Sequence, residues 1–321
     1  MNSGVLEAGP VIGLDLGGTK IAGALVAPGG RVLARDRRPT PADAGPRAVL
    51  DALADSARAL AAGVVPAPRA IGVAAAGLID PEAGVVRSAT AIIAGWAGTA
   101  VAAELARRAG LPVACDNDVR AAACAELEAG PSGSTLLQLS VGTGIGGAIA
   151  YRGRLLTGRQ GVAGHLGHLP SPEAAGLLCS CGAVGHLEAV ASGPGMAAAY
   201  ARSAGAGGRP PALEEVVRRA EGGDRAAAGA VELGARAAGR ALGGLANAIG
   251  PDRVVVGGGV PGIGKRYWSA LRAGFAAELL PPLADLVPQP PAHGADAPLL
   301  GAALLTARLP LHRADPEGVL G

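Results

Sequence analysis

The sequence predicts an α/β protein with two domains, and two features of the chain support this. Short apolar runs that are typical of buried strands alternate with longer Ala- and Leu-rich segments at helical spacing. A hairpin of two apolar runs around a Gly- and Thr-rich turn also occurs twice, at 11–27 and at 134–151. A chain of 321 residues can hold two modest domains or one large α/β domain. The weak internal repeat favours two similar domains that each begin with such a hairpin.

The first half of the chain is expected to open with a three-stranded antiparallel meander at 11–16, 21–27 and 31–38, joined by tight glycine turns. The last strand of this half leads into the polar turn Asp116-Asn117-Asp118. Loops at the carboxyl ends of strands are where α/β proteins place their chemistry, so this turn is a candidate site. The other expected elements are helices over 43–62, 98–109 and 119–129 and strands over 70–76 and 112–115.

The second half is expected to repeat the opening hairpin and then to become mostly helical. Its strands are expected over 134–141, 145–151 and 254–260, and 281–296 is expected to be a loop. The expected helices are 187–203, 212–221, 224–250, 265–279 and 298–308.

The composition excludes several classes of function. A net charge of +2 without a Lys/Arg cluster argues against nucleic acid, and one Phe, two Trp and three Tyr leave little for stacking on bases. The N-terminal MNSGVLEAGP lacks the features of a signal peptide, and the weakly apolar run 89–103 is too short to span a bilayer. Four cysteines fit a reducing compartment, and Cys115 and Cys124 are expected to be small core residues. The sequence therefore predicts a cytoplasmic protein without a membrane partner.

The segment from Gly161 to Glu188 concentrates residues that bind metal ions. Cys179 and Cys181 form a Cys-x-Cys pair, with His168 before it and His186 after it. Zinc prefers thiolate and imidazole ligands in a tetrahedron, and two close ligand pairs joined by a short loop supply that geometry. The alternative is two buried thiols and some surface imidazoles, but four such residues within nineteen positions favour zinc. Because all four positions would be filled by protein, the zinc is expected to be structural.

Three glycine-rich turns follow apolar strands, at Leu16–Lys20, Gly142–Gly147 and Gly257–Gly259. Glycine lets the backbone approach an anion and point successive N–H groups at it, and Thr19 and Thr143 add hydroxyl donors. Each turn alone is weak evidence, since glycine is common in hairpins and no P-loop motif is present. Together they favour phosphate binding.

With these residues in view, the sequence resembles the ROK family of sugar kinases, within the actin/hexokinase-like ATPase superfamily. The resemblance extends from Gly13 to about Ala307, and several motifs in the same order make it specific. The matching motifs are Asp15–Lys20, Ile71–Ala76 with Gly77, Asn117-Asp118, Val141–Gly147, Gly161–His168, Cys179–Glu188 and Val254–Gly259.

The resemblance implies an actin/hexokinase-like, ribonuclease H-like fold of two domains with a cleft between them. The smaller α/β domain would comprise 1–117 with about 297–311, and the larger one, with the zinc loop, 118–296. ATP and a sugar would meet in the cleft, and the family suggests a homodimer through the C-terminal domain.

The resemblance also implies a role for each matching residue. Asp118 would be the general base that accepts the proton of the attacking hydroxyl, and Asp15 would help to organise Mg²⁺. Asn117 and Glu188 would bind sugar hydroxyls, and His168 would bind zinc through one ring nitrogen and reach the sugar with the other. ATP would be held by the backbone of Gly17, Gly18, Thr19, Thr143, Gly144, Gly257 and Gly258.

Each carboxylate also has an ordinary structural explanation. Asp118 stands where a helix N-cap is expected, and Asp15 could be a hairpin-turn acid. Glu188 could be a solvated acid that the dipole of its helix favours.

Three departures from the family pattern bear on specificity. His165 replaces the Glu that normally faces the anomeric end of the sugar, as in the bacterial N-acetylmannosamine kinases of the family. His186 replaces the third zinc cysteine, which leaves a Cys₂His₂ set. Ile92 stands where an Asn that binds a sugar hydroxyl is usual.

The favoured function is phosphorylation of the 6-hydroxyl of a hexose or N-acylhexosamine, with N-acetylmannosamine slightly ahead of glucose. The first alternative is a sugar sensor without turnover; family repressors carry an N-terminal DNA-binding domain, and the fourteen residues before Asp15 are too few for one. The second alternative is a phosphoryl donor other than ATP, such as polyphosphate.

Overall fold

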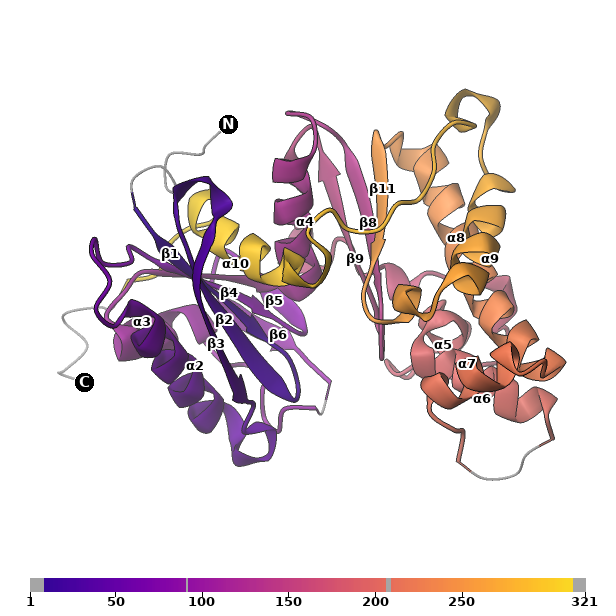
Figure 1. Ribbon diagram of the computed structural model, residues 1–321, viewed down its shortest axis with the longest axis horizontal. Helices are drawn as coiled ribbons and strands as arrows, with labels where there is room; N and C mark the ends of the chain where they lie inside the picture. Colours follow the sequence, from indigo (N-terminus) through magenta and orange to yellow (C-terminus); the bar gives the residue numbers. More distant parts are fainter. Residues whose placement is uncertain (1–8, 91, 206–208, 314–321) are drawn as a thin grey trace. The chain divides into compact units, whose positions relative to one another are not determined.

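The computed structural model describes residues 9–90, 92–205 and 209–313, and these fall into two compact units (Figure 1). The first unit contains the described residues up to Ser132, the short segment Thr157–Ala163 and the described residues from Ala292 onward. The second unit contains Gly133–Leu156 and Gly164–Pro291. Each unit is built around a sheet of its own.

The first unit has a five-stranded mixed sheet in the order β3-β2-β1-β4-β7. The first three strands form the expected antiparallel meander, while β4 and β7 add to β1 in parallel. Because β1, β4 and β7 are parallel, their carboxyl ends lie at one edge of the sheet. The strands are β1 Val11–Leu16, β2 Lys20–Val26, β3 Val32–Pro39, β4 Ile71–Ala75 and β7 Val113–Asn117.

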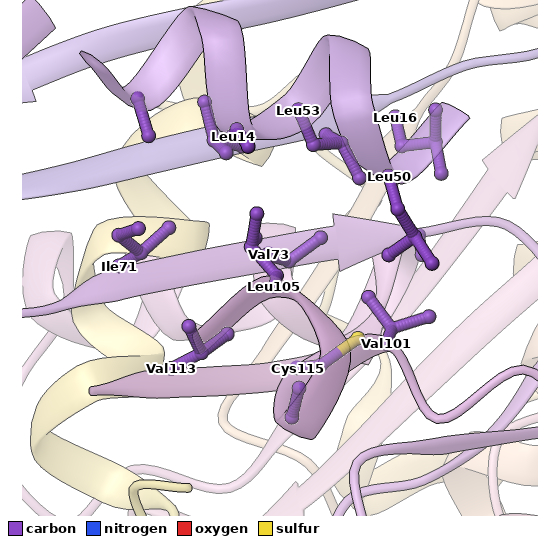
Figure 2. Close-up of a cluster of buried hydrophobic side chains, with 14 of the residues drawn as sticks. Leu14, Leu16, Leu50, Leu53, Ile71, Val73, Val101, Leu105, Val113 and Cys115 are labelled. Atoms are coloured by element: carbon purple, nitrogen blue, oxygen red, sulfur yellow. The ribbon is translucent and has the colours of Figure 1, made fainter. Parts of the chain in front are cut away.

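Helices cover both faces of this sheet. On one face, leucines of α2 (Gly45–Ala61) and the apolar side of α3 (Val101–Ala109) pack on Leu, Ile and Val side chains of the strands (Figure 2). On the other face, α10 (Ala297–Arg308) packs against the strands and against α4 (Asp118–Ala129). Helices α10 and α4 approach closely because Gly301 of α10 has no side chain. A Cβ at this position would lie 1.8 Å from the carbonyl oxygen of Ala121 in α4.

The second unit has a four-stranded sheet in the order β10-β9-β8-β11. Again an antiparallel hairpin, β8–β9, is joined by a parallel neighbour, β11, so the topology repeats that of β2-β1-β4. The repeated hairpin that the sequence indicated is therefore also a structural repeat. The strands are β8 Leu136–Val141, β9 Ile145–Tyr151, β10 Arg154–Leu155 and β11 Arg253–Gly257.

The helices of the second unit are packed around α8 (Arg225–Ile249). Its neighbour α9 (Lys265–Ala276) lies close beside it, because Gly239 and Gly243 of α8 face the backbone of α9. Alanines of α8 belong to the core of this unit together with apolar side chains of β8, β11 and α9. The remaining helices are α5 Glu188–Ala191, α6 Gly193–Ser203 and α7 Leu213–Glu221.

Several expected elements differ in detail from the structure. The helix expected over 187–203 is two helices, because Ser192 adopts an extended conformation (φ −73°, ψ 164°) and caps α6 by accepting from the Gly195 amide. Helix α3 begins at Val101 rather than at 98, where Gly98 has a φ of +86°. The small hairpin of β5 (Leu78–Asp80) and β6 (Val85–Ser88) was not expected, since the two strands are only three and four residues long.

Within residues 9–90, 92–205 and 209–313, no helix is both long enough and apolar enough to cross a bilayer.

Candidate active site

The turn between β7 and α4 holds the expected catalytic pair in fixed positions. Asn117 is the N-cap of α4, and its Oδ1 accepts from the amides of Val119 (2.9 Å) and Arg120 (3.3 Å). Its Nδ2 donates to the carbonyl of Gly77 at 3.0 Å, which ties the turn to the end of β4. The capping role considered for Asp118 thus belongs to Asn117. Asp118 is the first helical residue, and its Oδ1 accepts from the Val119 amide at 2.9 Å.

Asp15 and Asp118 form a carboxyl pair at the carboxyl edge of the first sheet. The pKa of Asp15 is raised to about 6: burial is the main cause, the charge of Asp118 adds to the rise, and Lys20 opposes it. Burial also raises the pKa of Asp118, although the Val119 amide and the Asn117 side chain oppose the rise. Two neighbouring carboxyl groups with raised pKa values are typical of acid–base and cation-binding sites.

The first glycine turn, Gly17–Thr19, lies beside this pair. The Gly17 amide donates to the Lys20 carbonyl at 3.0 Å, and the hydroxyl of Thr40 donates to the Gly17 carbonyl at 2.7 Å. Ile92 stands against this turn: a Cβ at Gly18 would lie 2.3 Å from Ile92 Cγ2. Only glycine fits at position 18 while the isoleucine keeps this place.

In the second unit, two glycine turns meet at one pocket of about 710 Å³. Because β8 and β11 are parallel, the turns that follow them lie at the same edge, and a Cβ at Gly258 would be 2.3 Å from the Val141 carbonyl oxygen. A pocket of this volume fits a nucleoside. Gly142, Thr143 and Gly259 belong to its lining, whereas Gly257 and Gly258 do not.

The sequence did not identify the other walls of this pocket. They come from the start of α6, from the segment that leads into α7 and from the 3-10 turn after β11, namely Gly193, Pro194, Ala197, Arg209–Glu214, Val260 and Ile263. The run Arg209-Pro210-Pro211 is the one local sign that could have marked this wall, since consecutive prolines give a stiff, non-helical segment.

Glu188 connects the glycine turn after β8 to residues 177–185, the cysteine hairpin that holds Cys179 and Cys181. Its Oε2 accepts from the Ile145 amide at 2.8 Å, and its Oε1 accepts a short hydrogen bond from the hydroxyl of Ser180. A Cβ at Gly144 would lie 2.8 Å from the same Oε2. The carboxylate therefore has partners in two loops and is not simply a solvated acid at the start of α5.

The four expected zinc ligands lie together. The ligand atoms of His168, Cys179, Cys181 and His186 are all within 4.8 Å of one another. The Cys179 sulfur is 3.7 Å from His168 Nδ1, and the Cys181 sulfur is 3.3 Å from His186 Nδ1. Tetrahedral zinc bonds of about 2.1 Å to nitrogen and about 2.3 Å to sulfur place such donors about 3.6 Å apart, so the donor set fits a zinc ion.

His165 lies next to this cluster. Its ring is stacked on that of His168 with centroids 6.4 Å apart and an interplanar angle of 16°. Since the distances to cysteine sulfur involve Nδ1 of His168, its Nε2 is the ring nitrogen that stays available to other groups. The imidazole of His165 thus lies alongside one of the four candidate ligands.

The chain is similar in sequence and in structure to known proteins of one family. The model of the ROK family matches residues 11–308. The N-acetylmannosamine kinase of Escherichia coli (strain 55989 / EAEC) is 35% identical over 297 residues, covering 92% of this chain and 97% of that protein. The ROK hexokinase from Thermus thermophilus superposes with a TM-score of 0.81 at 36% identity, covering 92% of this chain and 97% of that chain. A ROK family glucokinase from Streptomyces griseus, in complex with glucose and AMPPNP, gives 0.78 at 31% identity, over 92% and 99%.

The chain belongs to the ROK family. Its fold is the α/β actin- and hexokinase-like fold of these kinases, as the sequence predicted. It is a sugar kinase, a phosphotransferase with an alcohol acceptor.

Proposed function

We propose that the protein transfers the γ-phosphoryl group of ATP to the 6-hydroxyl of N-acetylmannosamine, with glucose as the next candidate. The observation that carries this proposal is the constellation of Asp118 beside Asp15 at the end of parallel strands in a ROK kinase. Phosphoryl transfer needs a base within reach of the attacking hydroxyl and a cation beside the phosphates.

In this proposal Asp118 removes the proton of the 6-hydroxyl while that oxygen attacks the γ-phosphorus and ADP leaves. Its raised pKa makes it a stronger base than an exposed aspartate, and the helix cap by Asn117 fixes its position. The second hydrogen of Asn117 Nδ2 remains for a sugar hydroxyl, because the first is donated to Gly77.

ATP would be held by glycine turns and by the pocket of the second unit. The backbone of Gly17–Thr19 and of Thr143–Gly144 would bind phosphates, and the pocket would enclose the adenosine near Gly257 and Gly258. Asp15 would hold Mg²⁺, which would neutralise phosphate charge in the transition state.

The sugar would be bound by Glu188, His168 and His165. The structural zinc would be held by His168, Cys179, Cys181 and His186 and would fix the loop that presents these imidazoles. The choice of sugar rests on His165, because an imidazole in place of a carboxylate removes a strong acceptor for two hydroxyls and leaves room for a 2-acetamido group. The name of the E. coli relative points to the same substrate.

The test is a coupled ADP-release assay with ATP and Mg²⁺ on glucose, mannose, N-acetylglucosamine and N-acetylmannosamine. We expect the highest kcat/KM with N-acetylmannosamine, and His165→Glu should shift the preference toward glucose. If the wild-type protein prefers glucose, glucose would replace N-acetylmannosamine as the proposed substrate, and the proposed kinase activity would stand. If folded, zinc-bound protein phosphorylates none of the four sugars, the result would favour a sugar sensor without turnover. If it is active with polyphosphate but not with ATP, polyphosphate would replace ATP as the proposed phosphoryl donor.

A further inference from the structure

We infer that Arg120, together with Asp116, is a positioning residue that clamps the turn bearing Asn117 and Asp118 to two other segments of the first unit. This inference rests on the proposed function for its kinetic consequences. The clamp itself is inferred only from the contacts that Arg120 makes.

Arg120 is the largest of the side chains that are fully buried, with 1% of its surface exposed, and Asp116 has none. The guanidinium donates to Asp116 Oδ1 through Nε at 2.8 Å and through a short bond from Nη2. It also donates to the carbonyl of Gly161 at 2.6 Å and to that of Ile79 at 2.9 Å, each 41 residues away in the chain. One side chain therefore joins α4, β5 and the segment 157–163.

The approach of these segments is so close that it requires glycine at position 161. Gly161 has a φ of +76°, and a Cβ there would lie 2.3 Å from the Ile79 carbonyl oxygen. A fork of five N–H donors is the group that can satisfy two carbonyls and a carboxylate at once; the single ammonium of lysine cannot match this geometry.

The same pair also holds the catalytic turn. Asp116 Oδ1 accepts from the Asn117 amide at 2.7 Å, and the Arg120 amide donates to Asn117 Oδ1. Without the arginine, Asp116 would be an unpaired buried carboxylate whose second oxygen already lacks a hydrogen-bond partner among the described residues. It would become protonated, and its contact with the Asn117 amide would weaken.

Arg120 on α4 also acts on Asp118 through its charge, and the charge of Asp118 in turn acts on Asp15 on β1. Lys20 on β2 acts on Asp15, and Asp116 at the end of β7 is paired with Arg120. The positive charge of Arg120 lowers the pKa of Asp118. Its removal should therefore raise that pKa and move the acid limb of the kcat/KM profile to higher pH.

The experiment compares Arg120→Lys, Arg120→Met and the double variant Asp116→Asn/Arg120→Met. Arg108→Met is the matched control, because Arg108 is also a largely buried arginine of the first unit paired with two carboxylates, Asp51 and Glu104. Thermal unfolding, amide hydrogen exchange, kcat, the KM for ATP and the pH profile are measured for each variant.

We expect Arg120→Met to lower kcat by about 100-fold, the loss typical of a small misplacement of a catalytic group. The KM for ATP should stay unchanged, because the Arg120 side chain bonds to Asp116, Gly161 and Ile79 and not to the Gly17–Thr19 turn or to the lining of the nucleoside pocket. Arg120→Lys should keep the acid limb in place, since the charge remains, yet still lose kcat. The double variant should regain thermal stability because no unpaired charge is left, without regaining kcat.

Two results would overturn the inference. One is a double variant that regains kcat along with stability, which would make the pair merely structural. The other is unchanged hydrogen exchange around 77–80, 117–120 and 159–163 in Arg120→Met relative to Arg108→Met. Hydrogen exchange does not depend on turnover. It therefore tests whether Arg120 holds these segments together even if the wild-type protein phosphorylates none of the sugars.

Discussion

Asp15 is a carboxyl group that the fold buries among apolar side chains. It sits in a strand of apolar neighbours, where burial and the charge of Asp118 make its ionised form unfavourable. Such a placement weakens the fold and suits a site in which a cation is to be bound.

The first prediction follows from this raised pKa. Because the pKa is about 6 in the folded protein and near 3.8 when unfolded, the folded state binds more protons between these values, and stability falls as the pH rises through that window. Asp15→Asn should remove this fall: the variant should be more stable than wild type above pH 6 and equally stable below about pH 4. Thermal unfolding without nucleotide or Mg²⁺ measures it. A variant less stable than wild type at pH 7 would contradict the burial of an uncompensated charge.

The sequence identified the residues whose chemistry is visible in their type and spacing. Asp15, Asp118, the four zinc-ligand candidates and the glycine turns could be named because carboxylates, thiols and glycines are informative on their own. Arg120, Thr40 and Ser180 could not, because each acts through side-chain contacts that only the folded chain creates, and an arginine in a helix is usually solvent-exposed.

Among the elements of the fold, the cysteine hairpin is the short segment whose own hydrogen bonds are least sufficient to fix its conformation. It has no helix or long strand, and its backbone is held by a few turns and by the bridge between Leu178 and Val184. A metal ion would supply the missing cross-link.

The second prediction concerns this hairpin. Purified protein should contain about one zinc per chain by elemental analysis. Cys179→Ala should lose the metal and lower the melting temperature, whereas Cys115→Ala, which removes a buried thiol far along the chain, should keep it. His186→Cys should also keep it, because it supplies an equivalent ligand. Folded wild-type protein without zinc would refute the site.

The third prediction uses two glycines of one helix, α8. A Cβ at Gly229 meets nothing within 4 Å, so Gly229→Ala should raise the free energy of unfolding by about 0.5–1 kcal/mol. A Cβ at Gly239 would lie 2.0 Å from the Leu271 carbonyl of α9, so Gly239→Ala should lower it by about 1–3 kcal/mol. Urea denaturation of both variants measures the difference. Equal effects would mean that α8 and α9 do not pack through glycine.

Most elements were predictable, and the failures have local causes. Long helices with a regular apolar period and strands of continuous apolar residues can be predicted from the sequence, as α8 and β1 were. The break between α5 and α6 depends on one extended serine, and the β5–β6 hairpin is too short to show a period.

At the scale of the whole molecule, the chain uses one topology twice. In each unit an antiparallel hairpin joins a parallel strand, and the glycine turns follow the parallel strands at one edge. The sequence showed the repeat through its two hairpins. It could not show that the segment 157–163 returns to the first unit, because that depends on the buried contacts of Arg120 and Gly161.

The central claim is that Asp118 is the base for phosphorylation of a sugar 6-hydroxyl. The most direct test is an NMR analysis of the product formed from sugar, ATP and Mg²⁺ by wild type and by Asp118→Asn, with sugar binding measured for both. We predict a 6-phosphate monoester from wild type, a rate about 1,000-fold lower for the variant, and similar sugar affinity. A phosphate at another position, or a variant about as fast as wild type, would contradict the account.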